Sequence, residues 1–301
     1  MVPLDRPEDG DRVQRSTHGH PASETGGATD RASTFIRVLE GLAGHVAPGS
    51  RILDFGCGNG NMVHGLCRLG YDAFGCDVEF KDGPYVPELT GPGRLRLTGQ
   101  HPYSLPFDDC SFDVVVSDQV FEHVVDYDSV LREIRRVLRK NGTSLHVFPS
   151  RYAPIEPHVY VPCATIVRAW WWLLLWARLG IRNEFQEGDL YVLVAAKNRD
   201  YLRDCTNYLT RRDIQAAFAR YFPVVRFAER EYLLRAEPGG RLRQQIGGLP
   251  LLPNVYSELR SRVVYATKAT AIPWRGAQCR CDVGACGGPT RSSQCMRSSS
   301  R

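Results

Sequence analysis

The segment RILDFGCGNGN, residues 51–61, constrains the fold of this chain more than any other. It joins a short apolar run to three closely spaced glycines, and a helical pattern of apolar residues follows them. Glycines let a backbone turn sharply and approach a ligand closely, and the amide groups at the start of the next helix can bind one. The segment therefore predicts a strand, a tight ligand-binding turn and a helix.

Short β-branched runs alternate with helical patterns along much of the remaining chain, which predicts βαβ units. One helix is predicted from Asp126, its N-cap, to the stop at Asn141-Gly142, and another over residues 211–221. The predicted strands lie near residues 51–55, 73–77, 94–98, 112–117, 144–148, 224–229 and 262–267. The predicted fold class is α/β, a Rossmann-like, mostly parallel sheet of about seven strands flanked by helices.

The pattern breaks at residues 151–209, which predicts a helical and aromatic insertion after the fifth strand. Ligands of open α/β sheets sit outside the carboxyl ends of the strands, so the insertion should lie over the site as a lid. Residues 34–150 and 210–268 would then form one domain. Residues 1–33 and 269–301 lack hydrophobic periodicity, and we expect them to be a disordered leader and a disordered Cys/Ser/Arg-rich tail.

Composition excludes several classes of protein. The formal charge of +5 is not gathered in a dense basic stripe, so no nucleic-acid partner is expected. Nothing near Met1 resembles a signal peptide, and the scattered cysteines up to residue 205 read as reduced thiols, so a cytoplasmic protein is expected. The tail cysteines lack paired C-x-x-C spacing, and no metal site is predicted from Cys279, Cys281, Cys286 and Cys295.

The apolar run AWWWLLLWA, residues 169–177, is too short to cross a bilayer, which takes about 20 residues. The favoured interpretation is a buried lid helix that packs on the end of the sheet. Two alternatives remain open, a peripheral membrane contact through Trp170 to Trp176 and a pocket wall for an apolar substrate, because indole rings are apolar with one polar edge.

Two carboxylates accompany the glycine turn. Asp77 ends the second predicted strand, where it can accept hydrogen bonds from both hydroxyls of a ribose, and Asp54 adds negative charge beside the turn. A dinucleotide site would have the spacing G-x-G-x-x-G, whereas this turn reads G-C-G-N-G and then Asn61. A nucleoside that carries a positive charge fits the pattern better than a pyrophosphate, although the turn alone does not separate the two.

Together these motifs resemble the class I S-adenosylmethionine-dependent methyltransferases, in particular the small-molecule group related to the ubiquinone and menaquinone C-methyltransferases. The most specific likeness is YSLPFDDCSFDVVVSDQVFEHV, from Tyr103 to Val124, in which the LPF, SFD and EHV elements occur in register. The resemblance covers residues 34–150, and residues 210–268 more weakly. It implies S-adenosyl-L-methionine as the cofactor and a small-molecule methyl acceptor.

The implied cofactor-binding residues lie in the two motifs, in the LPF turn and at the end of the fourth strand. They are Asp54, Gly56, Cys57, Gly58, Asn59, Gly60, Asp77, Val78, Tyr103, Ser104, Leu105, Ser117 and Asp118. His101 stands where the family often has an acidic residue near the adenine. The SDQV tetrapeptide lacks the Pro-Pro signature of amino methyltransferases, and the chain has no Asp-Asn pair of the magnesium-dependent kind, so neither subclass is favoured.

Two histidines are candidate general bases, His123 in the EHV element and His158 in IEPHVYVP. An imidazole can remove a proton from an acceptor hydroxyl near neutral pH. His123 could instead serve local architecture or cofactor packing. The predicted reaction is metal-independent, in-line methylation of a hydroxyl on a sugar, lipid-linked or secondary-metabolite acceptor. The alternatives are a cofactor-binding protein without catalysis and a nicotinamide-dependent oxidoreductase, and the oligomeric state is not predicted.

Overall fold

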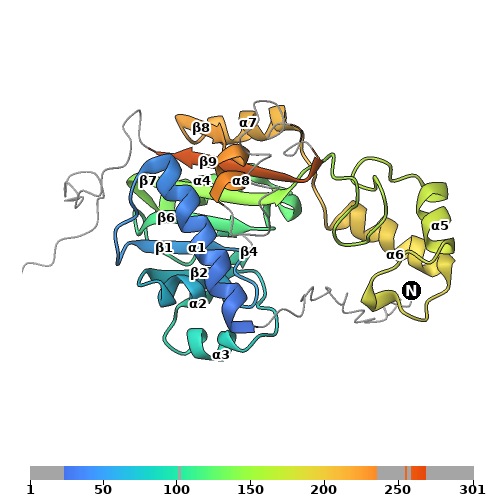
Figure 1. Cartoon of the computed structure of the whole chain (residues 1–301), viewed down its shortest axis with the longest axis horizontal. Coiled ribbons are helices and arrows are strands. Elements are labelled where there is room, and N and C mark those ends of the chain that lie inside the picture. Colours follow the sequence, from blue (N-terminus) through green and yellow to red (C-terminus); the bar gives the residue numbers. More distant parts are fainter. Residues whose placement is uncertain (1–23, 101–102, 236–254, 256–258, 269–301) are drawn as a thin grey trace, which may run out of the picture.

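The computed structural model describes residues 24–100, 103–235, 255 and 259–268. Its centre is a seven-stranded sheet with helices on both faces (Figure 1). In sheet order the strands are β3 (Leu95–Leu97), β2 (Asp72–Asp77), β1 (Arg51–Phe55), β6 (Phe112–Asp118), β7 (Leu138–Pro149), β9 (Ser261–Thr267) and β8 (Val224–Phe227). The predicted α/β fold, with a mostly parallel sheet of about seven strands, is confirmed.

The direction of chain progress across the sheet reverses between β1 and β6. From β1 the chain moves outward to β2 and β3, and it then returns to place β6 and β7 on the other side of β1. These five strands run parallel, whereas β9 is antiparallel to both of its neighbours. A reversal of this kind opens a crevice at the carboxyl ends of the two central strands, which is where such sheets bind ligands.

Each face of the sheet has its own hydrophobic core. One core lies against α1 (Glu24–Ala43), α2 (Asn61–Arg68) and α8 (Glu229–Arg235), and the other against α4 (Tyr127–Val137) and α7 (Arg211–Ala219). Side chains along a strand alternate between faces, so Val114 and Val116 of β6 enter the first core and Val115 the second. The short helix α3 (Tyr85–Thr90) contacts β3, and a hairpin of two short strands, β4 (Gly99–Gln100) and β5 (Tyr103–Ser104), contacts α4 through β5.

The prediction that the disordered leader extends to residue 33 is wrong for residues 24–33, because α1 begins at Glu24. Ala28, Ala32, Phe35 and Leu39 are buried at helical spacing and pack this helix onto the sheet. The helix contains Gly26, Gly27 and Thr29, whose low helix propensity hid the pattern. Residues 1–23 and the predicted tail, residues 269–301 with their four cysteines, lie outside the described residues.

Two further boundaries differ from the prediction. Asp126 caps α4 as predicted, its side chain accepting a hydrogen bond from the Ser129 amide at 3.0 Å. The helix ends at Val137 rather than at Asn141-Gly142, because the chain enters β7 at Leu138, which pairs with Phe112 of β6. The strand predicted over residues 224–229 ends at Phe227, and α8 follows it.

The insertion, residues 151–209, contains α5 (Trp170–Arg178), the short η2 (Glu184–Gln186) and α6 (Tyr191–Asp204) around a small core of their own. It projects beyond the carboxyl ends of the strands in Figure 1. The interpretation of α5 as a buried helix on the sheet end is wrong, because α5 packs against α6. Residues 159–164 of the insertion cover the helix together with α6, so Leu173 and Ala177 are buried, while Trp171 on the outer side remains 63% exposed. Among the described residues, no helix combines the length and the apolar character needed to cross a membrane.

Candidate functional site

The glycine turn lies directly against the end of β6. The Gly56 and Cys57 amides both donate to the Cys76 carbonyl, at 2.8 and 3.1 Å, which folds the turn back onto β2. Gly56 has a φ of +80°, and a Cβ at this position would lie 2.3 Å from Cγ2 of Val120. Only glycine tolerates both the positive φ and the close approach to Val120. The backbone of the turn can therefore pack directly against the residues that follow β6.

Asp77 joins the two predicted cofactor motifs. Its carboxylate accepts hydrogen bonds from the Gly58 amide at 2.8 Å and from the Val78 amide at 2.7 Å. Each oxygen retains lone-pair capacity, because a carboxylate can accept about four hydrogen bonds. The geometry holds Asp77 beside the turn, where it could bind the hydroxyls of a ribose.

The remaining members of the glycine motif differ in accessibility. Cys57 is buried, and Asn59 accepts a hydrogen bond from the Asn61 amide at 3.3 Å. Gly60, with a φ of +79°, is the N-cap residue of α2. Val78 is 41% exposed and lies beyond the turn. The predicted residues of this motif are therefore brought together around one turn.

Asp54 places a further carboxyl group next to the turn. Its side chain is 3% exposed, and burial together with the charges of Asp118 and Asp77 raises the pKa of its carboxyl well above the usual value. Three carboxylates at one strand edge favour a ligand with positive charge, because such a ligand offsets both the burial and the mutual repulsion.

Arg31 of α1 reaches the same edge and was missed by the sequence analysis, since it fell in the predicted leader. Its guanidinium donates to both oxygens of Asp118, at 2.6 and 2.5 Å, and to the Tyr232 hydroxyl. Burial acts to lower the pKa of Arg31. The charge of Asp118 and its hydrogen bonds, together with Tyr232, outweigh burial and raise this pKa above its usual value. The buried spacing Ala28, Ala32, Phe35 is the signal that could have found this helix.

The predicted adenine contacts lie at the hairpin that follows β3. Tyr103 packs against the second core and Ser104 is exposed, while Leu105 is buried and its amide donates to Glu133 at 2.8 Å. The Leu105 side chain therefore belongs to the core, whereas Tyr103 and Ser104 remain accessible at the hairpin. His101 lies outside the described residues.

The structure corrects the placement of Ser117. Its side chain is fully buried, with Oγ 2.8 Å from Nδ1 of His146, because alternate residues of β6 face opposite sides of the sheet. Burial lowers the pKa of His146 to about 3, so this pair is neutral and belongs to the core. Asp118, the next residue, reaches the strand edge.

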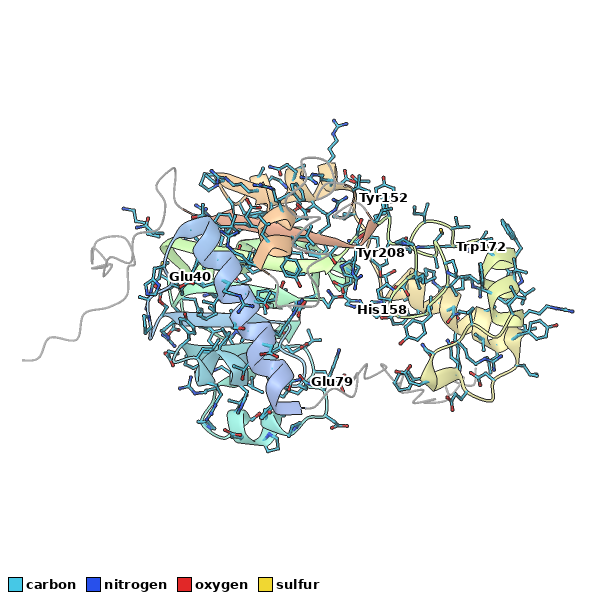
Figure 2. The ribbon with its side chains drawn as sticks, viewed as in Figure 1. Glu40, Glu79, Tyr152, His158, Trp172 and Tyr208 are labelled. Carbon is cyan, nitrogen blue, oxygen red and sulfur yellow. The ribbon has the colours of Figure 1, made fainter. Side chains whose placement is uncertain are left out.

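The two predicted histidines come together although 35 positions separate them in the chain. Their ring centroids are 4.9 Å apart, at an interplanar angle of 70°. His123 ends the short η1 (Phe121–His123) after β6, and His158 belongs to the insertion, at the junction with the sheet seen in Figure 2. Burial lowers the pKa of His123 to about 4, so this imidazole is neutral at pH 7.

Two buried glutamates flank the histidines. Glu156 accepts hydrogen bonds from Nδ1 of His158 at 2.8 Å and from the Tyr208 hydroxyl at 2.6 Å, and these outweigh burial so that its pKa is lowered. Glu122 is 1% exposed, and neither of its side-chain oxygens has a hydrogen-bond partner among the described residues. Burial, reinforced by Asp118 and Glu156, raises the pKa of Glu122 to about 8.

The end of the insertion is fastened to the EHV element. His123 Nδ1 lies 2.6 Å from the Cys205 carbonyl, the Asn207 amide donates to the Glu122 carbonyl at 2.6 Å, and the Asn207 side chain donates to the Val124 carbonyl at 2.8 Å. Sequence reasoning missed Cys205, Asn207 and Tyr208, because they stand in an aperiodic stretch with no motif.

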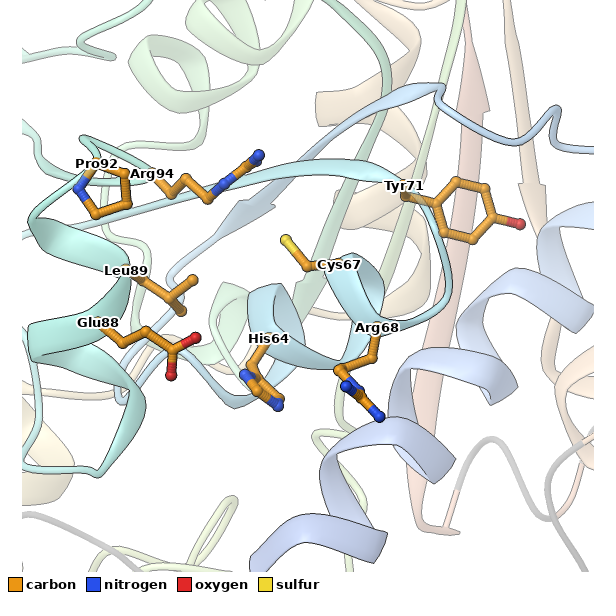
Figure 3. A pocket seen from close by; sticks show the side chains of 8 residues that line it. All are labelled: His64, Cys67, Arg68, Tyr71, Glu88, Leu89, Pro92 and Arg94. Atoms are coloured by element: carbon orange, nitrogen blue, oxygen red, sulfur yellow. The ribbon is translucent and has the colours of Figure 1, made fainter.

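A separate hollow lies between α2 and α3, and Figure 3 shows it from close by. His64, Arg68, Glu88 and Arg94 are among its lining side chains, and none of the predicted site residues lines it. It is therefore not part of the candidate site, which is the crevice edge between the glycine turn, Asp118 and the histidine pair.

Residues 53–145 match the family described as "Methyltransferase domain". These residues form a methyltransferase domain. The matched range begins in β1 and ends in β7, so it contains the glycine turn, Asp77, the LPF element and His123. The resemblance predicted from the sequence is confirmed for this part of the chain.

Curated relatives share this methyltransferase domain over limited lengths. The ubiquinone biosynthesis O-methyltransferase of Pelagibacter ubique is 32% identical over 94 residues, 31% of this chain and 39% of that protein. The glycine/sarcosine/dimethylglycine N-methyltransferase of Actinopolyspora halophila is 32% identical over 131 residues, 40% of this chain and 22% of that protein. The chain thus spans well under two thirds of the length of these relatives.

Among solved structures, geranyl diphosphate C-methyltransferase from Streptomyces coelicolor A3(2) is similar, with a TM-score of 0.42 and 16% identity. The alignment covers 79% of this chain and 76% of that one.

Proposed function

We propose that this protein transfers a methyl group from S-adenosylmethionine to a small-molecule acceptor. The observation that carries the proposal is the joint placement of Asp77 and the glycine turn, with Gly58 hydrogen-bonded to the Asp77 carboxylate at 2.8 Å and the acidic Asp54 beneath. A ribose fits the first pair, and the positive charge of the sulfonium and ammonium groups fits the acidic edge. The match of residues 53–145 to the methyltransferase domain family supports the same reaction.

Each part of the cofactor has a group of suitable chemistry. Asp77 would bind the ribose hydroxyls, and the backbone around Tyr103 to Leu105 would border the adenine. Arg31 would attract the carboxylate of the methionine moiety, since its guanidinium lies at the same strand edge. Asp54 and Asp118 would face the cationic groups.

The transfer is an in-line displacement. The nucleophile of the acceptor bonds to the methyl carbon while the carbon–sulfur bond breaks, and the electron pair stays on sulfur to give S-adenosylhomocysteine. Because the sulfonium is already reactive, the protein mainly has to align the three atoms and exclude water. We place the acceptor against His123 and His158 and propose a hydroxyl nucleophile, whose proton must be removed.

We also propose that the insertion covers this site. His158 and Tyr208 come from its two ends, and both hydrogen-bond to the buried Glu156. Cys205 and Asn207 fasten the segment to the residues that follow β6. A segment held at both ends beside the histidines is suited to closing the acceptor pocket against water.

The outer face of the insertion supports a peripheral membrane contact as a further proposal. Trp171 and Leu175 of α5 and its C-cap residue Leu179 are 63%, 42% and 63% exposed and are spaced four residues apart, so they form one stripe. The start of α6 adds the exposed run Leu190 to Leu193, and Arg178 lies over the Tyr191 ring at 5.9 Å, which brings the two helices together. Exposed aromatic and aliphatic side chains beside arginine are typical of helices that rest at a lipid interface.

The test is transfer of labelled methyl from S-adenosylmethionine into a cell extract, followed by mass spectrometry of the labelled product. We expect one class of small molecule to gain the label and Asp77→Ala to abolish the gain. Binding of S-adenosylhomocysteine without any transfer would instead favour a binding protein. Binding of NADH alone would favour the oxidoreductase.

A further inference from the structure

We propose that Glu122, His123 and His158 bind one divalent first-row transition-metal ion, such as Zn²⁺, with a coordination position open to the methyl acceptor. Each residue offers one ligand atom, and these atoms all lie within 4.8 Å of one another. The sequence alone does not indicate this site, because two of the ligands lie in the EHV element and the third comes from the insertion. Four observations carry the proposal.

The first is the orientation of His123. Its Nδ1 lies 2.6 Å from the Cys205 carbonyl oxygen, and a carbonyl can only accept a hydrogen bond, so Nδ1 carries the ring proton. Nε2 therefore presents its lone pair, and it lies 3.9 Å from Oε1 of Glu122. A neutral imidazole fixed in this tautomer is the form that ligates a metal.

The second is the support of His158. Its Nδ1 lies 2.8 Å from Oε1 of Glu156, and the Glu156 carboxylate is itself held by the Tyr208 hydroxyl and by the His158 and Val159 amides. Metal-binding histidines commonly donate their second N–H to a carboxylate in this way, which fixes the ring and raises its basicity. Both histidines thus have the outer hydrogen bond that a ligand needs.

The third is the state of Glu122. Its side chain is 1% exposed, and both oxygens lack a hydrogen-bond partner among the described residues. A buried carboxylate without partners is unfavourable in a folded protein unless a cation or a hydrogen-bond donor satisfies it. Because Glu122, His123 and His158 each offer a ligand atom within 4.8 Å of the others, a bound cation would satisfy the buried carboxylate and engage both imidazoles.

The fourth is the geometry and identity of the ligand set. Tetrahedral Zn²⁺ with bonds of about 2.1 Å holds its ligand atoms about 3.4 Å apart. The ligand atoms here lie within 4.8 Å of one another, so each separation must contract by at most about 1.4 Å, which side-chain rotation can supply. Two imidazoles and one carboxylate are a set found in catalytic zinc sites, which keep their fourth position for water or substrate. Magnesium and calcium prefer oxygen ligands and fit less well.

The role of the ion in methyl transfer rests on the proposed function, whereas its binding does not. An acceptor hydroxyl at the open position would lose its proton to the solvent, because a bound cation lowers the pKa of a ligated oxygen. The resulting oxyanion attacks the methyl carbon, and the carbon–sulfur bond breaks with its electron pair on sulfur. In this form the imidazoles are ligands, and neither acts as the general base.

The test is a titration of the chelator-treated, full-length protein with Co²⁺, read by its visible absorption. Cobalt reports the type of ligand, since thiolates from the ten cysteines add near-ultraviolet charge-transfer bands that nitrogen and oxygen ligands lack. We expect one equivalent to bind with a nitrogen and oxygen spectrum. Glu122→Gln and His158→Gln, which nearly conserve side-chain volume, should each weaken binding about tenfold or more, and Glu156→Gln about tenfold.

The matched control is His45→Gln, at a histidine on the surface whose side chain is 69% exposed. It should leave the affinity unchanged. Equal binding by the wild type, Glu122→Gln and His158→Gln would overturn the site, as would a spectrum of thiolate ligands only. Titration with S-adenosylhomocysteine separates the two proposals. If cobalt binds and S-adenosylhomocysteine does not, the proposed function is wrong and the metal site stands. If S-adenosylhomocysteine binds and cobalt does not, the metal site is wrong and the proposed function stands.

Discussion

Replacing Gly56 by alanine tests how tightly the glycine turn is fitted against the end of β6. A Cβ at residue 56 would lie 2.3 Å from Cγ2 and 2.9 Å from Cγ1 of Val120, at a φ of +80°. Gly49 is a matched control, because its φ is +77° and nothing lies within 4 Å of the corresponding Cβ. The difference between the two alanine variants isolates the contact with Val120.

Alanine in the left-handed region costs about 1 kcal/mol, and this cost is common to both variants. Forcing a methyl group against Val120 adds roughly 1–3 kcal/mol in Gly56→Ala alone. We therefore expect the free energy of unfolding to fall by about 1 kcal/mol for Gly49→Ala and by about 2–4 kcal/mol for Gly56→Ala. Val120→Ala removes the clashing methyl groups, so the double variant should recover roughly 1–3 kcal/mol as coupling energy.

Urea unfolding of the four variants measures these energies, and titration with S-adenosylhomocysteine measures the function of the turn. Gly56→Ala should bind about tenfold more weakly, equivalent to a loss of about 1.4 kcal/mol, because the displaced turn carries the Gly58 amide away from Asp77. Equal stability losses at residues 49 and 56, or no coupling between residues 56 and 120, would refute the packing argument.

Three other predictions follow from the same edge and from the insertion. Asp54→Asn should raise the midpoint of thermal unfolding more at pH 8 than at pH 4. The pKa of the Asp54 carboxyl is raised in the folded state, so the wild type loses stability as the pH rises and the variant does not. The same variant should bind S-adenosylmethionine more weakly. Arg31→Gln should lower the free energy of unfolding by about 1 kcal/mol, because the ion pair with Asp118 is partly exposed. It should also weaken S-adenosylhomocysteine binding. Arg31→Lys keeps the charge but not the two-pronged geometry, so it should restore binding only in part. Replacing Trp171 and Leu175 by serine should reduce cosedimentation of the protein with anionic vesicles. Val125→Ser is the control, because Val125 is 77% exposed on the sheet domain, and it should leave cosedimentation unchanged. Equal loss in both variants would contradict a membrane contact of the insertion.

The sequence predicts the fold well where local signals agree with tertiary pairing. The β1 strand, the glycine turn, Asp77 and the Asp126 cap are each determined by neighbouring residues, and the structure places them as predicted. The end of α4 depends instead on which strand β7 pairs with, and a loop signal such as Asn141-Gly142 contains no information on that choice.

The candidate site is harder to predict because its groups come from distant segments. Arg31 reaches Asp118 across 87 positions, and Tyr208 reaches Glu156 across 52. Periodicity and motifs describe neighbours in the chain, so they found His123 and His158 singly. They could not show that the two rings meet, or that a buried Glu122 lies beside them.

The most direct test of the central claim is a calorimetric titration of the purified protein with S-adenosylhomocysteine and, separately, with NADH. We expect S-adenosylhomocysteine to bind one site per chain, with the affinity reduced about tenfold or more in Asp77→Ala, and NADH not to bind. Binding of NADH with no response to S-adenosylhomocysteine would contradict the account, and so would S-adenosylhomocysteine binding that Asp77→Ala leaves unchanged.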